Sequence, residues 1–149
     1  MKNIVPALIL FITSCSHNNH NDSRVKDQVI EITKEYNRVW QTLNVDSIAE
    51  FHSDKSFAYY WHGGLASANN DHFRKLFSTI LSTTKDWSIE MAQPLVQVIS
   101  DDAAIISFGF EALSTEKNGT KSNETGAITY IWNKINNKWK LVHIHESAK

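Results

Sequence analysis

The stretch WNKINNKWKLVHIHES, residues 132–147, decides the fold of this chain. In it, Asn136-Asn137 separates two segments in which large apolar residues alternate with polar ones. Asparagine tolerates the left-handed backbone that a two-residue hairpin turn requires, and alternation is typical of a strand with one buried face. The stretch therefore predicts an antiparallel β-hairpin in which Ile135 pairs with Lys138.

This pairing sorts the hairpin residues onto two faces, because alternate residues of a strand share a face. Tyr130 is expected opposite His143, and Ile128 opposite His145. One face then carries Ile128, Tyr130, Trp132, Trp139, Leu141, His143 and His145. We assign this larger, aromatic face to the interior of the protein. The other face exposes Ile131, Val142 and Ile144, and such a row of β-branched residues predicts a homodimer interface.

Further strands are expected upstream of the hairpin, as parts of one antiparallel meander. Apolar residues alternate with polar ones over residues 87–91. Pro94 predicts a bulge or an edge position, because proline cannot donate a hydrogen bond to a strand ladder. The next two strands are expected over residues 104–113 and 124–133.

The turn between these two strands leaves two registers open. Asn118-Gly119 is a strong hairpin signal. A two-residue turn would place Ser107, Gly109 and Glu111 in the interior. A turn with a glycine bulge shifts the register by one and places Ile106, Phe108 and Phe110 there instead. We favour the second register, because the first would turn two phenylalanines towards solvent.

Helices are expected before the strands. Apolar residues recur three and four positions apart over residues 24–43, which predicts an amphipathic helix. A short helix capped by Asp46 and a third helix capped by Asp71 are expected to follow. Aromatic residues over 57–61 predict a short strand between them. Helices grouped before a run of antiparallel strands predict an α+β fold.

The first residues are typical of an export signal rather than of a folded domain. Lys2 precedes an apolar run over residues 4–12, which is too short to span a bilayer. The following Ile12-Thr13-Ser14-Cys15 resembles the bacterial lipobox. This resemblance implies cleavage before Cys15 and lipidation of its thiol. An ordinary export signal with a chance cysteine is the alternative.

The chain is therefore expected to have three parts: a lipoprotein signal peptide over 1–14, a flexible tether over 15–23 and one domain over 24–149. The tether contains no apolar residue between Ser16 and Ser23. Lipidated Cys15 would anchor the exported protein to a membrane of the cell envelope.

Composition excludes several classes of protein. The 149 residues carry 15 Lys and Arg against 16 Asp and Glu, so the basic excess typical of nucleic-acid binders is absent. The single Cys excludes an internal disulfide and multi-cysteine metal sites. The sequence has no Gly-rich phosphate loop. We expect one domain, without a cofactor and without a nucleic-acid partner.

The order of elements and the last 50 residues resemble the nuclear transport factor 2-like, or SnoaL-like, superfamily. The nearest motif match is to the calcium/calmodulin-dependent protein kinase II association domain. Asp102-Ala103-Ala104-Ile105 and the closing stretch 139–147 carry this match. The resemblance implies a cone in which three helices pack into a curved sheet around a cavity. Phe110 and Tyr130 align with arginines in the cavity of that association domain. The resemblance therefore implies that aromatic surface replaces a potential anion site here.

The expected function is binding of a small, partly apolar or aromatic ligand in this cavity. The residues expected to line it are Tyr60, His62, Phe108, Phe110, Tyr130, His143 and His145. The alternative is a cavity enzyme of the dehydratase, isomerase or cyclase type, because imidazole titrates near neutral pH and the resemblance includes such enzymes. His143 and His145 are then the candidate acid and base.

Other uses of the histidines are weighed against these. A metal site at His143 and His145 needs a third ligand, which His62 or Glu111 could supply, but no spacing fixes either, and we expect no metal. His52 and His72 are expected on helix surfaces. The interior strand positions offer no Asp, which disfavours proton abstraction of the isomerase type.

Overall fold

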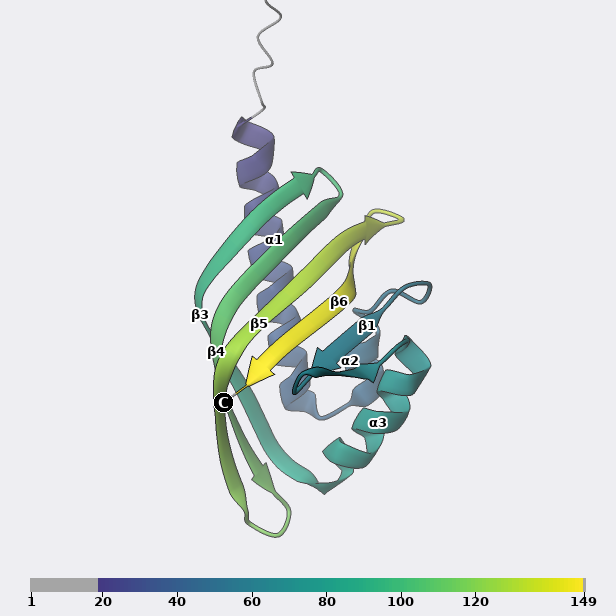
Figure 1. The fold of residues 1–149 in the computed structure, drawn as a ribbon, viewed down its shortest axis with the longest axis vertical. Helices are drawn as coiled ribbons and strands as arrows, with labels where there is room; N and C mark the ends of the chain where they lie inside the picture. Colours follow the sequence, from purple (N-terminus) through teal and green to yellow (C-terminus); the bar gives the residue numbers. More distant parts are fainter. Residues whose placement is uncertain (1–18, 149) are drawn as a thin grey trace, which may run out of the picture.

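The computed structural model describes residues 19–148 (Figure 1). Its helical segments are α1 (Asn19–Val39), the 3₁₀ turn η1 (Trp40–Thr42), α2 (Val45–Ala49) and α3 (Asn70–Thr83). Its strands are β1 (Ala58–Trp61), β2 (Gly64–Ser67), β3 (Thr84–Ser100), β4 (Ala103–Glu116), β5 (Lys121–Ile135) and β6 (Lys138–Ala148). The expected α+β order is confirmed. The helix α1 begins within the segment expected to be a tether.

Asparagines cap the two shorter helices. The side chain of Asn44 accepts hydrogen bonds from the backbone N–H groups of Asp46 and Ser47, and Asn69 accepts one from His72. These side chains satisfy donors that a helix start leaves unpaired. The predicted caps at Asp46 and Asp71 are wrong, because each of these residues lies in the first turn of its helix.

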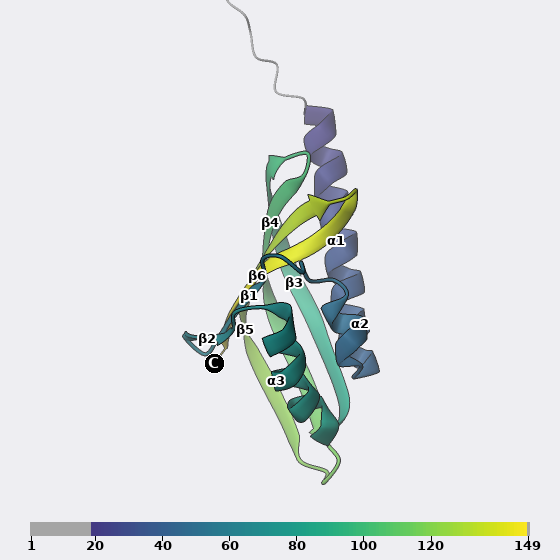
Figure 2. The ribbon, with the colours of Figure 1, turned by 90° about the vertical axis from the view of Figure 1, so that its right-hand side faces the viewer.

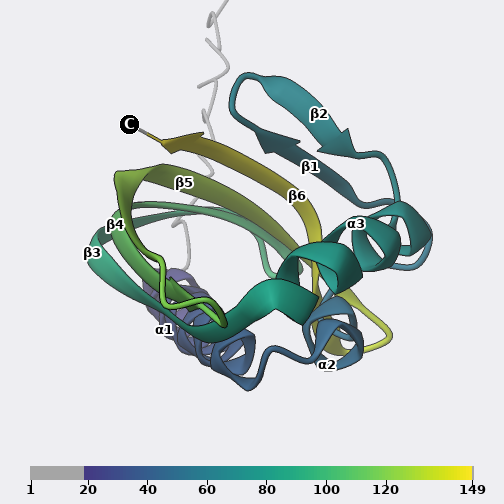
Figure 3. The same ribbon diagram turned by 90° about the horizontal axis from the view of Figure 1, so that it is seen from below.

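One curved sheet contains the six strands of residues 19–148, in the order β2-β1-β6-β5-β4-β3. Neighbours are antiparallel except β1 and β6, which run parallel. The helices lie on the concave side of this sheet (Figures 2 and 3). The sequence pattern did not predict β2, which follows Gly63 after a tight turn.

The two hairpin turns agree with the expected geometry. Asn136 and Asn137 have φ values of 51° and 60°, as a two-residue turn of the mirror-image type requires. In the other hairpin, Thr115 pairs with Lys121 and Gly119 has a φ of 89°. The favoured register is confirmed, because the side of β4 that carries Ile106, Phe108 and Phe110 is buried.

A bulge in β6 contradicts part of the predicted residue pairing in the last hairpin. Trp132 pairs with Leu141 as expected, but Ile131 pairs with His143, so that Val142 is an extra residue. One extra residue turns all later side chains to the opposite face. The predicted interior positions of His143 and His145 are therefore wrong. Ile144 is 3% exposed and faces the interior, so its assignment to the outer face is also wrong.

The core lies between α1 and the concave face of the sheet. Tyr36 of α1 and Trp132 of β5 are fully buried, with ring centroids 6.0 Å apart in an edge-to-face arrangement. The Trp132 indole N–H donates to Thr33 Oγ1 at 3.1 Å, and the Tyr130 hydroxyl donates to Asn37 Oδ1 at 3.3 Å. These bonds remove the cost of burying polar groups and fix how α1 packs against β5.

Candidate functional site

A cavity of about 230 Å³ lies between the sheet and the helices. Its aromatic lining consists of Tyr36, Trp40, Tyr59, Trp61, Phe77, Trp87, Phe110 and Tyr130. Its aliphatic lining consists of Ile80, Leu81, Ile89, Ala112, Ile128 and Ile144. Its polar lining consists of Thr84, Ser114, Ser122, Glu124 and Glu146. The cavity is smaller than the roughly 300–1,000 Å³ typical of drug-sized ligands, so it suits a molecule with one aromatic ring.

The parallel pairing of β1 with β6 builds the polar part of the wall. Tyr59 lies opposite Ile144 in this pairing, and one further step along the same face leads to Trp61 and Glu146. The Tyr59 hydroxyl donates a 2.6 Å hydrogen bond to Glu146 Oε2. A carboxyl group therefore lies in a mainly apolar wall, held there by a buried phenol.

The environment of Glu146 favours its neutral form. Burial raises the pKa of this carboxyl above its usual range, and the nearby Glu124 raises it further. The hydrogen bond from Tyr59 and the imidazole of His62 act in the opposite direction. Glu146 therefore keeps its proton to a higher pH than an exposed glutamate does.

Trp61 presents an unused hydrogen-bond donor. Its indole Nε1 is buried and has no hydrogen-bond partner within residues 19–148. A buried donor without a partner costs about 1–3 kcal/mol. Trp61 lines the cavity, so a ligand acceptor that reached this N–H would remove the cost.

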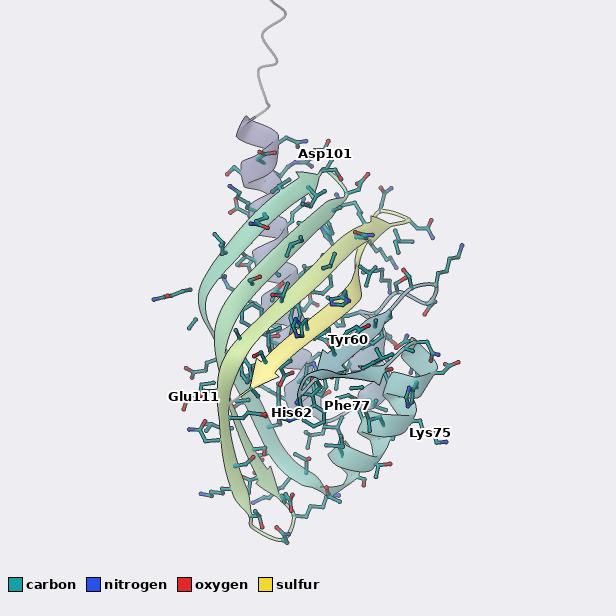
Figure 4. All side chains as sticks on the ribbon, viewed as in Figure 1. Tyr60, His62, Lys75, Phe77, Asp101 and Glu111 are labelled. Atoms are coloured by element: carbon teal, nitrogen blue, oxygen red, sulfur yellow. The ribbon has the colours of Figure 1, made fainter. Side chains whose placement is uncertain are left out.

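The rim of the cavity carries a second carboxylate. Glu124 of β5 lies 3.6 Å from His62 Nε2, measured to Oε1. His62 follows β1 with a φ of 48° and is exposed. Figure 4 shows His62 near the ends of β1 and β6. His62 therefore contacts the rim of the cavity. The prediction that it lines the cavity is wrong.

A polar chain lies behind the cavity wall. His52 is fully buried, stacks on Phe57 with 3.9 Å between ring centroids, and contacts the Tyr36 hydroxyl and Asn70 Oδ1 at 3.0 Å each. Asn70 donates its Nδ2 to the backbone oxygen of Ala49, so its Oδ1 accepts from His52 Nδ1. His52 Nε2 then accepts from Tyr36. The predicted surface position of His52 is wrong, whereas His72 is exposed as expected.

Burial holds His52 in its neutral form and lowers its pKa to about 3. The cavity residue Tyr36 is therefore oriented by a neutral imidazole, which in turn is oriented by an amide. The same burial raises the pKa of Tyr36 far above its usual value, so its phenol stays protonated.

The expected ligand residues fall into two groups. Phe110 and Tyr130 line the cavity, and Phe108 is buried against Tyr130, with ring centroids 5.3 Å apart. In contrast, Tyr60, His143 and His145 lie together on the outer face of the sheet, where the Tyr60 ring is 5.4 and 6.4 Å from the two imidazoles. Partial burial and the neighbouring His145 lower the pKa of His143.

Sequence reasoning missed Tyr59, Trp61 and Glu146 as cavity residues. Each of the three is adjacent in sequence to a residue predicted to line the cavity: Tyr60, His62 or His145. For the β1 pair the alternation gave no signal, because Tyr60 between Tyr59 and Trp61 is aromatic as well. The signal for Glu146 was hidden by the bulge in β6.

Two further properties concern residues 19–148 only. In this range, no three His, Cys, Asp or Glu side chains gather closely enough to hold a metal ion. No helix of the described residues is both long and apolar enough to cross a membrane. Cys15 lies outside the described residues.

Solved structures share the fold. A Xanthomonas campestris protein described as a calcium/calmodulin dependent protein kinase II association domain is 20% identical, with a TM-score of 0.73 over 82% of this chain and 86% of that one. A nuclear transport factor 2-like superfamily protein of Salmonella enterica is 21% identical, with a TM-score of 0.74 over 85% and 92%. A Novosphingobium aromaticivorans protein described as a scytalone dehydratase is 10% identical, with a TM-score of 0.77 over 87% of both chains.

These likenesses confirm the expected nuclear transport factor 2-like cone and, at such identities, show the fold alone. No curated protein matches the sequence. A family model does: the one for the calcium/calmodulin dependent protein kinase II association domain matches residues 25–149. That match covers nearly all of the structure described above, including the cone, its cavity and the closing hairpin. The chain therefore belongs to the calcium/calmodulin dependent protein kinase II association domain family.

Proposed function

We propose that this protein binds a small, partly apolar or aromatic ligand in its central cavity. The observation that carries the proposal is the mainly apolar cavity wall, to which Trp61 contributes a buried indole N–H that lacks a partner within the described residues. Aromatic walls supply binding energy through apolar burial, and a few polar groups orient the ligand. Trp61 and Glu146 provide one donor and one carboxyl group for this purpose.

A cavity-filling substitution tests this proposal. Ala112 lines the cavity and is 8% exposed, so Ala112→Leu should occupy part of the ligand volume. Ala127→Leu, an exposed position on the outer face of β5, is the matched control. We expect fragments found by ligand-observed NMR to bind the wild type and Ala127→Leu, and to lose binding in Ala112→Leu. Binding that survives in a folded Ala112→Leu protein would contradict the cavity as the site.

We further propose that the protein acts in the cell envelope. The apolar run over residues 4–12 and the lipobox-like sequence that ends at Cys15 support export and lipid anchoring. The domain would then hold its ligand close to a membrane surface. These residues lie outside the described part of the chain.

A homodimer is the proposed assembly. One row across the outer face of the sheet follows the strand pairing: Leu95, Ser107, Thr129, His145, Tyr60 and Leu65. This row contains no Lys, Arg, Asp or Glu, and a second row brings together Ile105, Ile131 and His143. These two rows of the outer face carry no charged side chain, which supports association with a second copy there. Membership of an association-domain family agrees with this proposal.

Acid–base catalysis in the cavity is the second candidate function. The observation that favours it is the raised pKa of Glu146 inside an aromatic cavity, because a carboxyl group shifted in this direction is a better proton donor and acceptor near neutral pH. The histidines considered at first do not support it, since both lie on the outer face. If catalysis occurs, Glu146→Gln should abolish turnover of any substrate found while binding is retained.

A further inference from the structure

The charges around the cavity have one sign. Of the described residues that line it, Glu124 and Glu146 are carboxylic acids, and none is a Lys, Arg or His. His62 contacts Glu124 from outside the lining. Glu146 uses Oε2 to accept the hydrogen bond from Tyr59, which leaves Oε1 available to a ligand.

The aromatic walls add to this negative character. Eight of the lining residues are aromatic, and the faces of such rings carry the negative part of the ring quadrupole. Trp40 and Trp87 lie with ring centroids 5.2 Å apart, and Trp40 meets Phe77 edge to face at 5.1 Å. A cation within about 6 Å of such faces is attracted by them, most strongly by tryptophan.

We propose that the ligand of this cavity is a small organic cation, namely an aryl or alkyl amine that also carries a hydrogen-bond acceptor. Its ammonium group binds Glu146 Oε1, its apolar part packs among the tryptophans, and its acceptor receives the Trp61 indole N–H. This inference rests on the proposed function and names the chemical class of its ligand.

Both carboxylates attract a cation in this role. Glu124 raises the pKa of Glu146 and so disfavours ionisation of Glu146. A bound ammonium group favours the ionised form of Glu146. A neutral ligand gains nothing from this attraction, and an anionic ligand is repelled.

Three probes of nearly equal size test the charge of the ligand: 2-phenylethylamine, 2-phenylethanol and phenylacetate. Calorimetric titration of the purified protein with each probe should give at least a tenfold lower Kd for the amine than for the alcohol, because hydrogen bonds to charged groups are the stronger ones. Phenylacetate should bind most weakly. Adding a hydroxyl to the amine, as in 2-amino-1-phenylethanol, should tighten binding further through Trp61.

A matched pair of variants tests the residue. Glu146→Gln keeps the size of the side chain and an acceptor for Tyr59, and should remove the preference for the amine while 2-phenylethanol binds as before. Glu111→Gln makes the same change on the outer face of the sheet, away from the helices, and should keep the preference (Figure 4). If Glu146→Gln does not fold, the three probes on the wild type still decide whether the cavity prefers a cation.

The outcomes separate this inference from the function on which it rests. Equal or tighter binding of 2-phenylethanol or phenylacetate would overturn the cationic ligand and leave the binding cavity intact. A preference for the amine that persists in Glu146→Gln would overturn the role of this carboxylate. Failure of all the probes to bind would count against both the inference and the proposed function.

Discussion

The hydroxyl of Tyr59 donates a 2.6 Å hydrogen bond to Oε2 of Glu146, although 87 positions separate the two residues in sequence. The parallel pairing of β1 with β6 brings them together at the end of the sheet that borders the cavity. Tyr59 is 5% exposed, so its hydroxyl is shielded from bulk water. Hydrogen bonds to carboxylates are stronger in such a buried environment than in water.

Tyr59→Phe should therefore destabilise the fold and raise the pKa of Glu146 further. The hydrogen bond from Tyr59 opposes the effect of burial on this carboxyl, and its loss leaves burial unopposed. We expect a loss of roughly 1.5–3 kcal/mol in the free energy of unfolding at neutral pH, the usual range for a hydrogen bond to a charged group. Chemical denaturation measures the loss, and a ¹³C-detected titration of the glutamate carboxyl groups measures the pKa.

Tyr60→Phe is the control for this substitution. Tyr60 is the next residue in β1, but its side chain is 38% exposed on the opposite face of the sheet. The same removal of a hydroxyl group there should change the free energy of unfolding by less than about 0.5 kcal/mol. Equal losses in the two variants would show that the bond to Glu146 contributes nothing specific.

The buried His52 should make the fold sensitive to acid. Its pKa falls from 6.5 in an unfolded chain to about 3 in the fold, mainly because burial disfavours the charged ring. Between these values the unfolded chain binds a proton that the folded protein does not, so stability falls as the pH falls from 6.5 towards 3. The full loss is on the order of 5 kcal/mol, at about 1.36 kcal/mol per pH unit.

Urea denaturation at pH 7 and pH 4 measures this effect. His52→Gln should be less stable at pH 7 and should lack most of the loss on acidification, whereas His72→Gln, at an exposed position, should retain it. Comparing variants cancels the contribution of Glu146, whose raised pKa acts in the opposite direction. A wild-type protein that loses no more stability than His52→Gln would show that this imidazole is not held neutral.

Gly126 should not tolerate a side chain. A Cβ atom there would lie 2.0 Å from the backbone oxygen of Ser147 and 2.9 Å from Phe110 Cε1. Gly126→Ala should therefore separate the ends of β5 and β6 and move a cavity wall, at a cost of roughly 1–3 kcal/mol. At Gly109 the nearest atom to a new Cβ lies at 3.8 Å, so Gly109→Ala should fall within about 1 kcal/mol of the wild type. Thermal melts compare the two, and equal melting temperatures would contradict the close approach.

Cys15→Ser should move the protein from the membrane fraction to the soluble exported fraction. The reason is that a lipidated Cys15 is the anchor that we infer from the lipobox-like sequence. Fractionation of cells that produce each form measures the change, with Ser16→Ala as the control that should stay with membranes. A variant that still sediments with membranes would exclude lipidation at this residue as the anchor.

Local patterns predicted the helices, the strands other than β2 and both hairpin turns, because these depend on neighbouring residues. Alternation gave the long strands, and Asn136-Asn137 gave a turn whose backbone angles match. The register of β6 was correct only as far as Leu141. Beyond it, the bulge at Val142 turned every later side chain.

The bulge could not be read from the hairpin, because β6 also contacts a segment from elsewhere in the chain at this point. The backbone N–H of Leu141 donates to Phe51 at 2.8 Å, and Ser53 donates to the oxygen of Leu141 at 2.9 Å. The segment after α2 thus pairs with β6 at the bulge, and such a contact leaves no trace in period-two alternation. The same error placed two histidines in the cavity and hid Glu146.

The last prediction concerns assembly of two copies through the outer face of the sheet. Ile131 is half-buried there, between Ile105 on β4 and His143 on β6. In a symmetric dimer each patch contacts its own copy, so one substitution places two new charges in one interface. Ile131→Lys should therefore give monomers in light scattering at concentrations at which the wild type is a dimer, because unpaired buried charges are costly. Thr79→Lys, on an exposed position of α3, adds the same charge and should leave the dimer unchanged. A wild type that is monomeric, or an Ile131→Lys protein that remains dimeric, would show that this face is not the interface between copies.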